Sequence, residues 1–152
     1  RVAMPESILV PYDGSPLPER ALQYACEEYP SSTLTTLFVV DKRTDETAAV
    51  GWGDHPSEWE DWLTERRGHA KELFEAAEAI AAEYDAEIRT SVAVGETAEM
   101  TIRVAEEYEA DLIVVGAHGQ SPLEDLLIGN VAKALVRRSP VPVTTVRGEE
   151  ET

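Results

Sequence analysis

Two glycine-containing turns carry residues whose chemistry suits a ligand site at the ends of strands. The first, Asp13-Gly14-Ser15, follows an apolar run and opens a helix-like segment. The second turn follows another apolar run and ends where a further helix begins; its candidate residues are Gly116, Ala117, His118, Gly119, Gly129, Asn130 and Val131. Glycine lets the backbone approach a ligand without a Cβ in the way, and a helix N-terminus offers unpaired N–H groups that suit a phosphate. We therefore treat both turns as parts of a candidate phosphate site.

Each turn taken alone also has an ordinary structural interpretation. Glycine after a strand commonly marks a tight connection to a helix, and Asn130 is a common helix N-cap. His118 is interpreted as a turn residue at the rim of the site and not as a catalytic base. The combination is more specific than either turn, because ligands of open parallel sheets bind beyond the carboxyl ends of the strands.

The elements that must position these turns alternate between strand and helix. Strands are expected at residues 7–12, 34–40, 88–94, 112–115 and 140–146, and helices at about 16–28, 57–84, 97–108 and 131–138. Strands separated by helices form βαβ units, so we predict an α/β fold with an open five-stranded parallel sheet and helices on both faces. The 152 residues suit one domain, with residues 1–6 as an N-terminal extension, 41–56 as a flexible loop and 148–152 as an acidic tail.

The strand sequences distinguish central from edge positions. Three of the runs, at 7–12, 34–40 and 112–115, are nearly continuous apolar runs, which is typical of strands covered on both faces. The run at 88–94 alternates polar and apolar residues, and the last run contains Pro142, which a central strand would not accommodate. We predict that these last two are the edges, and that pairing with a second subunit would cover an apolar edge.

Local signals describe the helices further. Ser15 is expected to cap the first helix, and Ser57 with Glu60 forms a capping box for the longest one. Cys26 lies in an apolar helical pattern and is predicted to be a core residue and not a nucleophile. The longest helix is expected to turn one apolar stripe toward the sheet, formed by Trp59, Trp62, Leu63, Ala70, Leu73, Phe74, Ala77, Ile80, Ala81 and Tyr84.

The charge balance excludes several classes of function. Lys and Arg number 13 against 30 Asp and Glu, a net charge of −17, which argues against nucleic-acid binding and against attachment to an anionic membrane. No apolar run approaches the roughly 20 residues that span a bilayer, and no signal-peptide pattern opens the sequence, so we expect a soluble, cytoplasmic protein. The acidity suggests a halophilic protein from a salt-rich cell; the alternative is an ordinary acidic mesophile protein. The three histidines are scattered, so a structural zinc site is not expected.

At this point the sequence resembles the universal stress protein family over nearly its whole length. The resemblance rests on the segments 8–15, 110–119, 127–132 and 139–143. The nucleotide-binding branch of that family carries glycine, two residues, glycine, nine residues, then glycine followed by Ser or Thr. Gly116, Gly119 and Gly129 stand at those positions with that spacing, and Asn130 replaces the Ser or Thr.

The resemblance implies an adenine-nucleotide fold, Rossmann-like and similar to the nucleotide alpha-hydrolases, with strand order 3-2-1-4-5. It implies ATP, or ADP or AMP, as ligand, accompanied by Mg²⁺ or Mn²⁺, and a homodimer through the fifth strand between Val141 and Val146. Asp13 would contact the ribose or adenine, the backbone near Val40 would face the adenine, and the three glycines with Asn130 would hold phosphates. Pro11, Ala117, His118 and Val131 complete the set of nucleotide-binding residues that the resemblance implies.

The main hypothesis is a dimeric ATP-binding module of the stress response, and not an enzyme. No Ser/His/Asp arrangement, no P-loop lysine and no paired carboxylates in a common motif occur, so at most slow, incidental hydrolysis is expected. The alternative is a stress-family interaction protein that binds no nucleotide and acts through its dimer or partner surface. Asn130 and the segment Gln120-Ser121-Pro122, which has no basic residue, motivate that alternative. An enzyme built on the same scaffold is the third hypothesis.

Overall fold

The structure, a computed structural model, describes residues 5–12, 16–40, 56–117 and 130–147. Its elements in chain order are β1 (Ser7–Pro11), α1 (Pro16–Glu28), β2 (Thr33–Val40), α2 (Pro56–Glu83), β3 (Ile88–Val94), α3 (Thr97–Glu107), β4 (Leu112–Ala117), α4 (Asn130–Arg138) and β5 (Val143–Arg147). The five strands form one parallel sheet in the order β3-β2-β1-β4-β5. The predicted α/β fold, the strand order and the two edge strands are confirmed.

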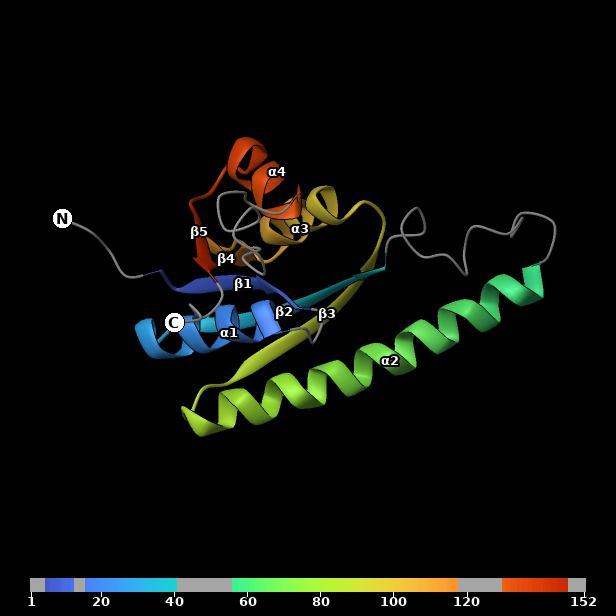
Figure 1. Ribbon diagram of the computed structural model, residues 1–152, viewed down its shortest axis with the longest axis horizontal. Coiled ribbons are helices and arrows are strands. Elements are labelled where there is room, and N and C mark those ends of the chain that lie inside the picture. Colours follow the sequence, from blue (N-terminus) through green and yellow to red (C-terminus); the bar gives the residue numbers. More distant parts are fainter. Residues whose placement is uncertain (1–4, 13–15, 41–55, 118–129, 148–152) are drawn as a thin grey trace, which may run out of the picture.

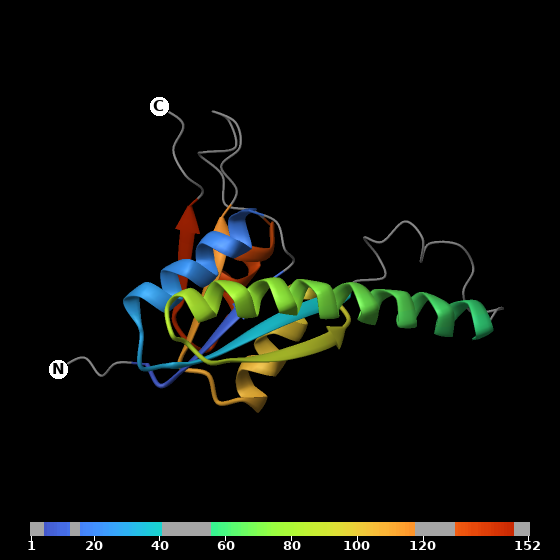
Figure 2. The same ribbon diagram turned by 90° about the horizontal axis from the view of Figure 1, so that it is seen from below.

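Helices cover both faces of this sheet (Figures 1 and 2). Helices α1 and α2 lie on one face, and α3 and α4 lie on the other. Each face has its own core, because successive side chains of a strand point to opposite faces. In β1, Ile8 and Val10 pack with the α1 and α2 residues Leu22 and Ala77, whereas Leu9 packs with Leu135 of α4 on the opposite face.

The fifth strand differs from its predicted bounds. It begins at Val143 and not at Pro140, and it ends at Arg147. Prolines 140 and 142 have no N–H to donate to a ladder, so regular pairing starts only after them. The carbonyl of Pro142 still accepts the N–H of Ile113 at 3.0 Å, which sets the register of β4 against β5. Strand β4 also runs two residues further than predicted, to Ala117.

The long helix α2 begins one residue earlier than predicted. Pro56 is its first residue, so Ser57 lies in the first turn and not at the N-cap. Residue 56, the last of the expected loop 41–56, therefore belongs to the helix. The predicted apolar stripe faces the sheet from Ala70 onward. The N-terminal turns extend past the strands (Figures 1 and 2), and residue 69 is still exposed. The side chains of residues 59, 62 and 63 lie outside the described part of the chain, as do residues 1–4, 41–55 and 148–152.

The core position predicted for Cys26 is confirmed. Its side chain is 2% exposed and packs in the cluster between α1, α2 and the sheet. Burial raises the pKa of this thiol to about 11. A neutral, inaccessible thiol is a poor nucleophile, so the residue contributes packing.

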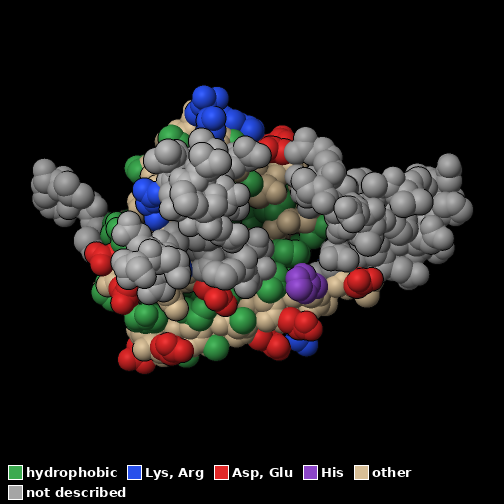
Figure 3. Space-filling view, viewed as in Figure 1, with side chains coloured by type: hydrophobic (Ala, Val, Ile, Leu, Met, Phe, Trp, Pro, Cys, Tyr) green, Lys and Arg blue, Asp and Glu red, His purple; other side chains and the backbone are tan. Residues whose placement is uncertain are grey.

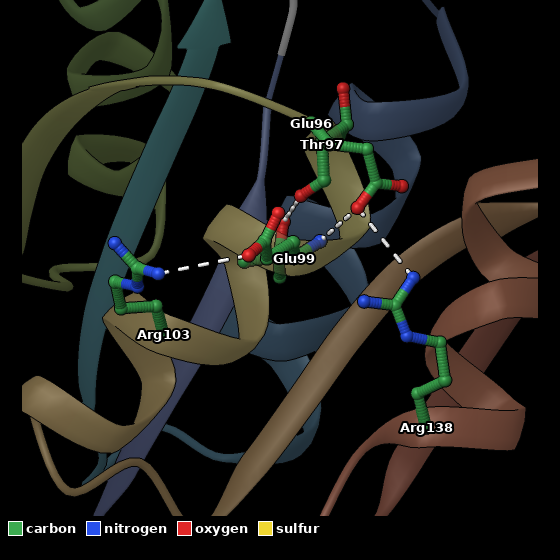
Figure 4. A network of polar contacts seen from close by, with 6 residues as sticks. Glu96, Thr97, Glu99, Arg103 and Arg138 are labelled. Atoms are coloured by element: carbon green, nitrogen blue, oxygen red, sulfur yellow. Dashed lines mark hydrogen bonds and ion pairs between the residues drawn. The ribbon is translucent and has the colours of Figure 1, made fainter.

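A small polar network joins the start of α3 to the end of α4 (Figure 4). The side chain of Glu96, the N-cap of α3, accepts the N–H of Glu99 at 2.8 Å. The same carboxylate lies 3.5 Å from the guanidinium of Arg138, the last residue of α4. Arg103 pairs with Glu99 one turn along α3. Of these contacts only the Glu96–Arg138 ion pair joins α3 to α4; the others lie within α3.

Candidate functional site

The winding of the chain reverses between β1 and β4, the two strands that carry the candidate turns. From β1 the chain continues into α1 on one face of the sheet, and from β4 it continues to α4 on the opposite face. In an open α/β sheet such a switch point separates the two connections and leaves room for a ligand beyond the carboxyl ends of the strands. The structure therefore brings the ends of both predicted strands to this point.

The ladder between β1 and β4 stops before either strand ends. Its register contains only the pairs Ile8–Leu112 and Leu9–Ile113, whereas β1 pairs with β2 over five residues, as far as Pro11. The next bond of the β1–β4 ladder would require an amide hydrogen on residue 11, and proline has none. The predicted site residue Pro11 thus ends the pairing of the two central strands at the switch point.

The end of β1 is recessed between its neighbours. Pro11 pairs with Leu37, and β2 continues three residues further, to Val40. Counting on from the Leu9–Ile113 pair puts Pro11 level with Val115, so Gly116 and Ala117 of β4 also extend past it. A ligand above the end of β1 would therefore lie between the last residues of β2 on one side and those of β4 on the other.

Backbone groups of β2 alternate in the direction they face near this recess. The carbonyl of Val40 accepts the N–H of Gly95 at 2.9 Å, so it points toward β3. The carbonyl of Leu37 accepts the N–H of Tyr12 at 2.8 Å, so it points toward β1. Groups of a parallel strand face its two neighbours in turn, and the carbonyl of Val39 therefore faces the end of β1. The sequence predicts Val40 as a binding residue, and the register adds the carbonyl of Val39, which faces the end of β1.

The start of α4 supplies the other half of the site. Asn130 is the first residue of this helix and Val131 follows it, half-buried against the core beside α3. The first N–H groups of an α-helix have no partner within the helix and carry the positive end of its dipole. Asn130 was predicted as the cap before the helix; it is instead the first helical residue.

Part of the predicted site lies outside the described residues. This holds for Asp13, His118, Gly119 and Gly129, whose positions remain predictions. Pro11, Val40, Gly116, Ala117, Asn130 and Val131 are described, and all belong to the three strand ends or to the start of α4.

The charges around the recess come from few described residues. The phenol of Tyr12, buried under the end of β1, donates to a carboxylate oxygen of Glu19 at 3.5 Å. Glu19 lies in the first turn of α1, where a negative charge complements the helix dipole. On the opposite side, Arg147 at the end of β5 pairs in register with Ala117. Arg147 lies one residue beyond the predicted end of the last strand at residue 146.

No group of three or more His, Cys, Asp or Glu side chains that would hold a metal ion occurs in the described part of the chain. These residues therefore do not fit a protein-held Mg²⁺ or Mn²⁺. None of the described helices combines the length and the hydropathy needed to cross a bilayer.

Comparison with known proteins agrees with this architecture. The family model described as the universal stress protein family matches residues 4–147. Universal stress protein MJ0531 of Methanocaldococcus jannaschii is 28% identical over 145 residues, which cover 93% of this chain and 82% of that protein.

Two solved structures extend the comparison to three dimensions. The structure of MJ0577 superposes with a TM-score of 0.77 at 25% identity, covering 98% of this chain and 100% of that one. A universal stress protein in complex with cAMP has a TM-score of 0.67 at 23% identity, covering 97% and 100% of the two chains. Because the family model spans nearly all of the sequence and the strand order is the same as the family resemblance implies, the chain belongs to the universal stress protein family.

Proposed function

We propose that this universal stress protein is a non-catalytic module that binds an adenine nucleotide at the recessed end of β1 and acts in the stress response as a homodimer. The observation that carries the proposal is the early end of the β1–β4 ladder at Pro11, directly at the switch point. The glycine spacing 116, 119 and 129 supports it, since these glycines lead from the end of β4 to the start of α4. A protein of the same fold has been solved with cAMP, which supports adenine as the base.

The geometry supports a particular placement of the nucleotide. The adenine would lie against the end of β2, where the carbonyl of Val39 is available to accept from an exocyclic amine. The phosphates would lie between Gly116 and the first N–H groups of α4, which suit an anion. Asn130 lacks the hydroxyl that the family places there, but an amide also donates to phosphate oxygens.

The direct test is a calorimetric titration of the nucleotide-stripped protein with ATP and Mg²⁺ in molar KCl. The proposal predicts saturable binding of one ATP per chain, with the nucleotide recovered intact afterwards by chromatography. Absence of saturable binding to a demonstrably folded protein would favour the alternative, an interaction protein that binds no nucleotide. Hydrolysis of many ATP molecules per chain would instead favour an enzyme.

A matched pair of variants locates the binding. Gly129→Asp places a carboxylate among the proposed phosphate contacts, so the affinity for ATP should fall more than tenfold. Gly68→Asp is the control: a Cβ at Gly68, an exposed position of α2, would meet no atom within 4 Å. Unchanged ATP affinity of the Gly129→Asp protein would reject the proposed site.

The dimer has its own test at β5. The ladder to β4 uses the backbone groups of Pro142 and of every second residue after it. The N–H of Thr145 therefore faces the free edge of the sheet. Thr145→Pro removes this donor, and Thr145→Val keeps it. We expect the light-scattering mass of the proline variant to be that of a monomer and the mass of the valine variant to be that of a dimer. If both variants had the mass of a dimer, the dimer contact would lie elsewhere.

A further inference from the structure

Charge is segregated along this chain. Residues 130–147 contain Lys133, Arg137, Arg138 and Arg147 and no Asp or Glu, although the protein as a whole carries 30 acidic residues. Figure 3 shows Lys and Arg side chains gathered at the α4 end of the molecule, while acidic side chains lie along α2. The α4–β5 unit is therefore a basic region of an otherwise acidic protein.

Within this region Lys133 lies in the first turn of α4, and the three arginines lie elsewhere. Arg137 and Arg138 lie at its C-terminal end, where Arg138 pairs with Glu96. A helix of nine residues is about 13 Å long, so these two side chains leave from the end remote from the proposed phosphate site. Arg147 belongs to the opposite edge, because it ends β5 beside Ala117, the last residue of β4.

The alternation of β5 decides which face Arg147 uses. Val146 packs in the core beside α1, and Val143 packs in the core beside α3 and α4. Side chains two residues apart share a face, so Val143, Thr145 and Arg147 all point to the face of α3 and α4. That is the face on which α4 begins, and the side chain of Arg147 is exposed there.

We infer that Arg147 is a phosphate-binding residue of the nucleotide site, supplying from β5 a permanent cation, since the β4–α4 connection contains no Lys or Arg. This inference rests on the proposed function. It adds to that function the residue that distinguishes a phosphorylated ligand from a nucleoside. A guanidinium presents donors in a planar fork that matches two phosphate oxygens, and it stays protonated at every relevant pH. The neutral backbone N–H groups of α4 and the Arg147 cation would thus both bind the polyphosphate.

The test compares Arg147→Ala and Arg147→Lys with the control Arg137→Ala. All three remove or alter one basic side chain of the same unit, but Arg137 lies at the remote end of α4. ATP is titrated calorimetrically into each nucleotide-stripped protein, and adenosine is measured by competition with a fluorescent adenine nucleotide. Molar KCl shortens the Debye length to about 3 Å. The loss of a direct contact therefore still lowers the measured affinity for ATP, whereas long-range attraction is screened.

We expect Arg147→Ala to weaken ATP binding about tenfold or more and to leave adenosine binding unchanged. Arg147→Lys should recover part of the loss, since it keeps the charge and not the fork, and Arg137→Ala should match the unmodified protein. ATP affinity equal to that of the unmodified protein in Arg147→Ala would overturn the inference while the proposed function stands. An equal loss for ATP and adenosine would overturn it in favour of a structural role. Absence of ATP binding by the unmodified protein would overturn both.

Discussion

Two adjacent threonines of β2 show that the hydrogen bonding of a buried hydroxyl depends on the face of the sheet to which its side chain points. Thr35 and Thr36 are both buried, at 1% and 0% exposed. The hydroxyl of Thr36 donates to the carbonyl of Arg89 at 3.3 Å, whereas the hydroxyl of Thr35 has no hydrogen-bond partner among the residues that the structure describes. Burying a hydroxyl costs desolvation free energy, and a hydrogen bond in the folded state offsets part of that cost.

Valine substitutions at these two positions should therefore have opposite effects. Thr35→Val keeps the shape of the side chain and removes the unpaired oxygen, so the free energy of unfolding should rise by about 1 kcal/mol. Thr36→Val removes a hydrogen bond and should lower it by about 0.5–1 kcal/mol. Urea unfolding of both variants measures the difference, and a loss of stability in Thr35→Val would show that its hydroxyl is satisfied.

The thiol of Cys26 gives a prediction about pH. Its raised pKa, about 11, means that the folded state holds this proton more tightly than the unfolded chain does. The stabilisation linked to that proton is complete below the pKa of the unfolded thiol, roughly 8.5, and is lost as the pH rises toward 11. At pH 9, thiol reagents should modify Cys26 slowly in the native protein and rapidly in urea. Equal rates would mean that the thiol is accessible in the folded state.

At the scale of elements, the N-terminus of α3 is the best-defined junction. Glu96 caps this helix and also faces Arg138 of α4 (Figure 4). The two interactions differ in expected strength, because N-cap hydrogen bonds contribute about 1 kcal/mol and exposed ion pairs only a few tenths.

Alanine substitutions separate the two contributions. Glu96→Ala removes both the cap and the ion pair, and should lower the free energy of unfolding by about 1 kcal/mol. Arg138→Ala removes only the ion pair and should cost no more than about 0.5 kcal/mol. The comparison is made by urea unfolding at moderate salt. If both variants lost the same free energy, the ion pair and not the cap would hold the junction.

At the scale of the whole molecule, the net charge of −17 acts on stability through self-repulsion. Screening weakens this repulsion as the Debye length falls from about 10 Å at 0.1 M salt to about 3 Å at 1 M. We expect the free energy of unfolding to rise steeply with KCl at low concentration and to level off as the charges become screened.

Thermal unfolding across a KCl series checks this expectation, with sucrose as the uncharged control. Sucrose stabilises by exclusion from the protein surface without screening charge, so it should give a gradual rise with no plateau. Stability that is independent of KCl would reject the hypothesis of a salt-adapted protein and favour the acidic mesophile alternative.

Much of the architecture follows from local patterns in the sequence. Hydrophobic periodicity gave the type and order of every element, and the alternation of β3 and Pro142 before β5 identified the two edges. The apolar pattern around Cys26 was enough to place it in the core. Such features are readable because each depends on residues within one or two turns or one strand.

The functional details depend instead on pairing between distant segments. Whether Val39 or Val40 faces the end of β1 is a matter of the register of β2 against β1 and β3. Pro11 is recessed because the two neighbouring strands extend past it, and the proposed role of Arg147 depends on its pairing with Ala117. A shift of one residue in register reverses every one of these orientations. The sequence by itself determined the type and order of the elements and predicted an adenine nucleotide as ligand. The tertiary structure decided which strand ends meet at the candidate site, because strand register is fixed by contacts between segments far apart in the chain.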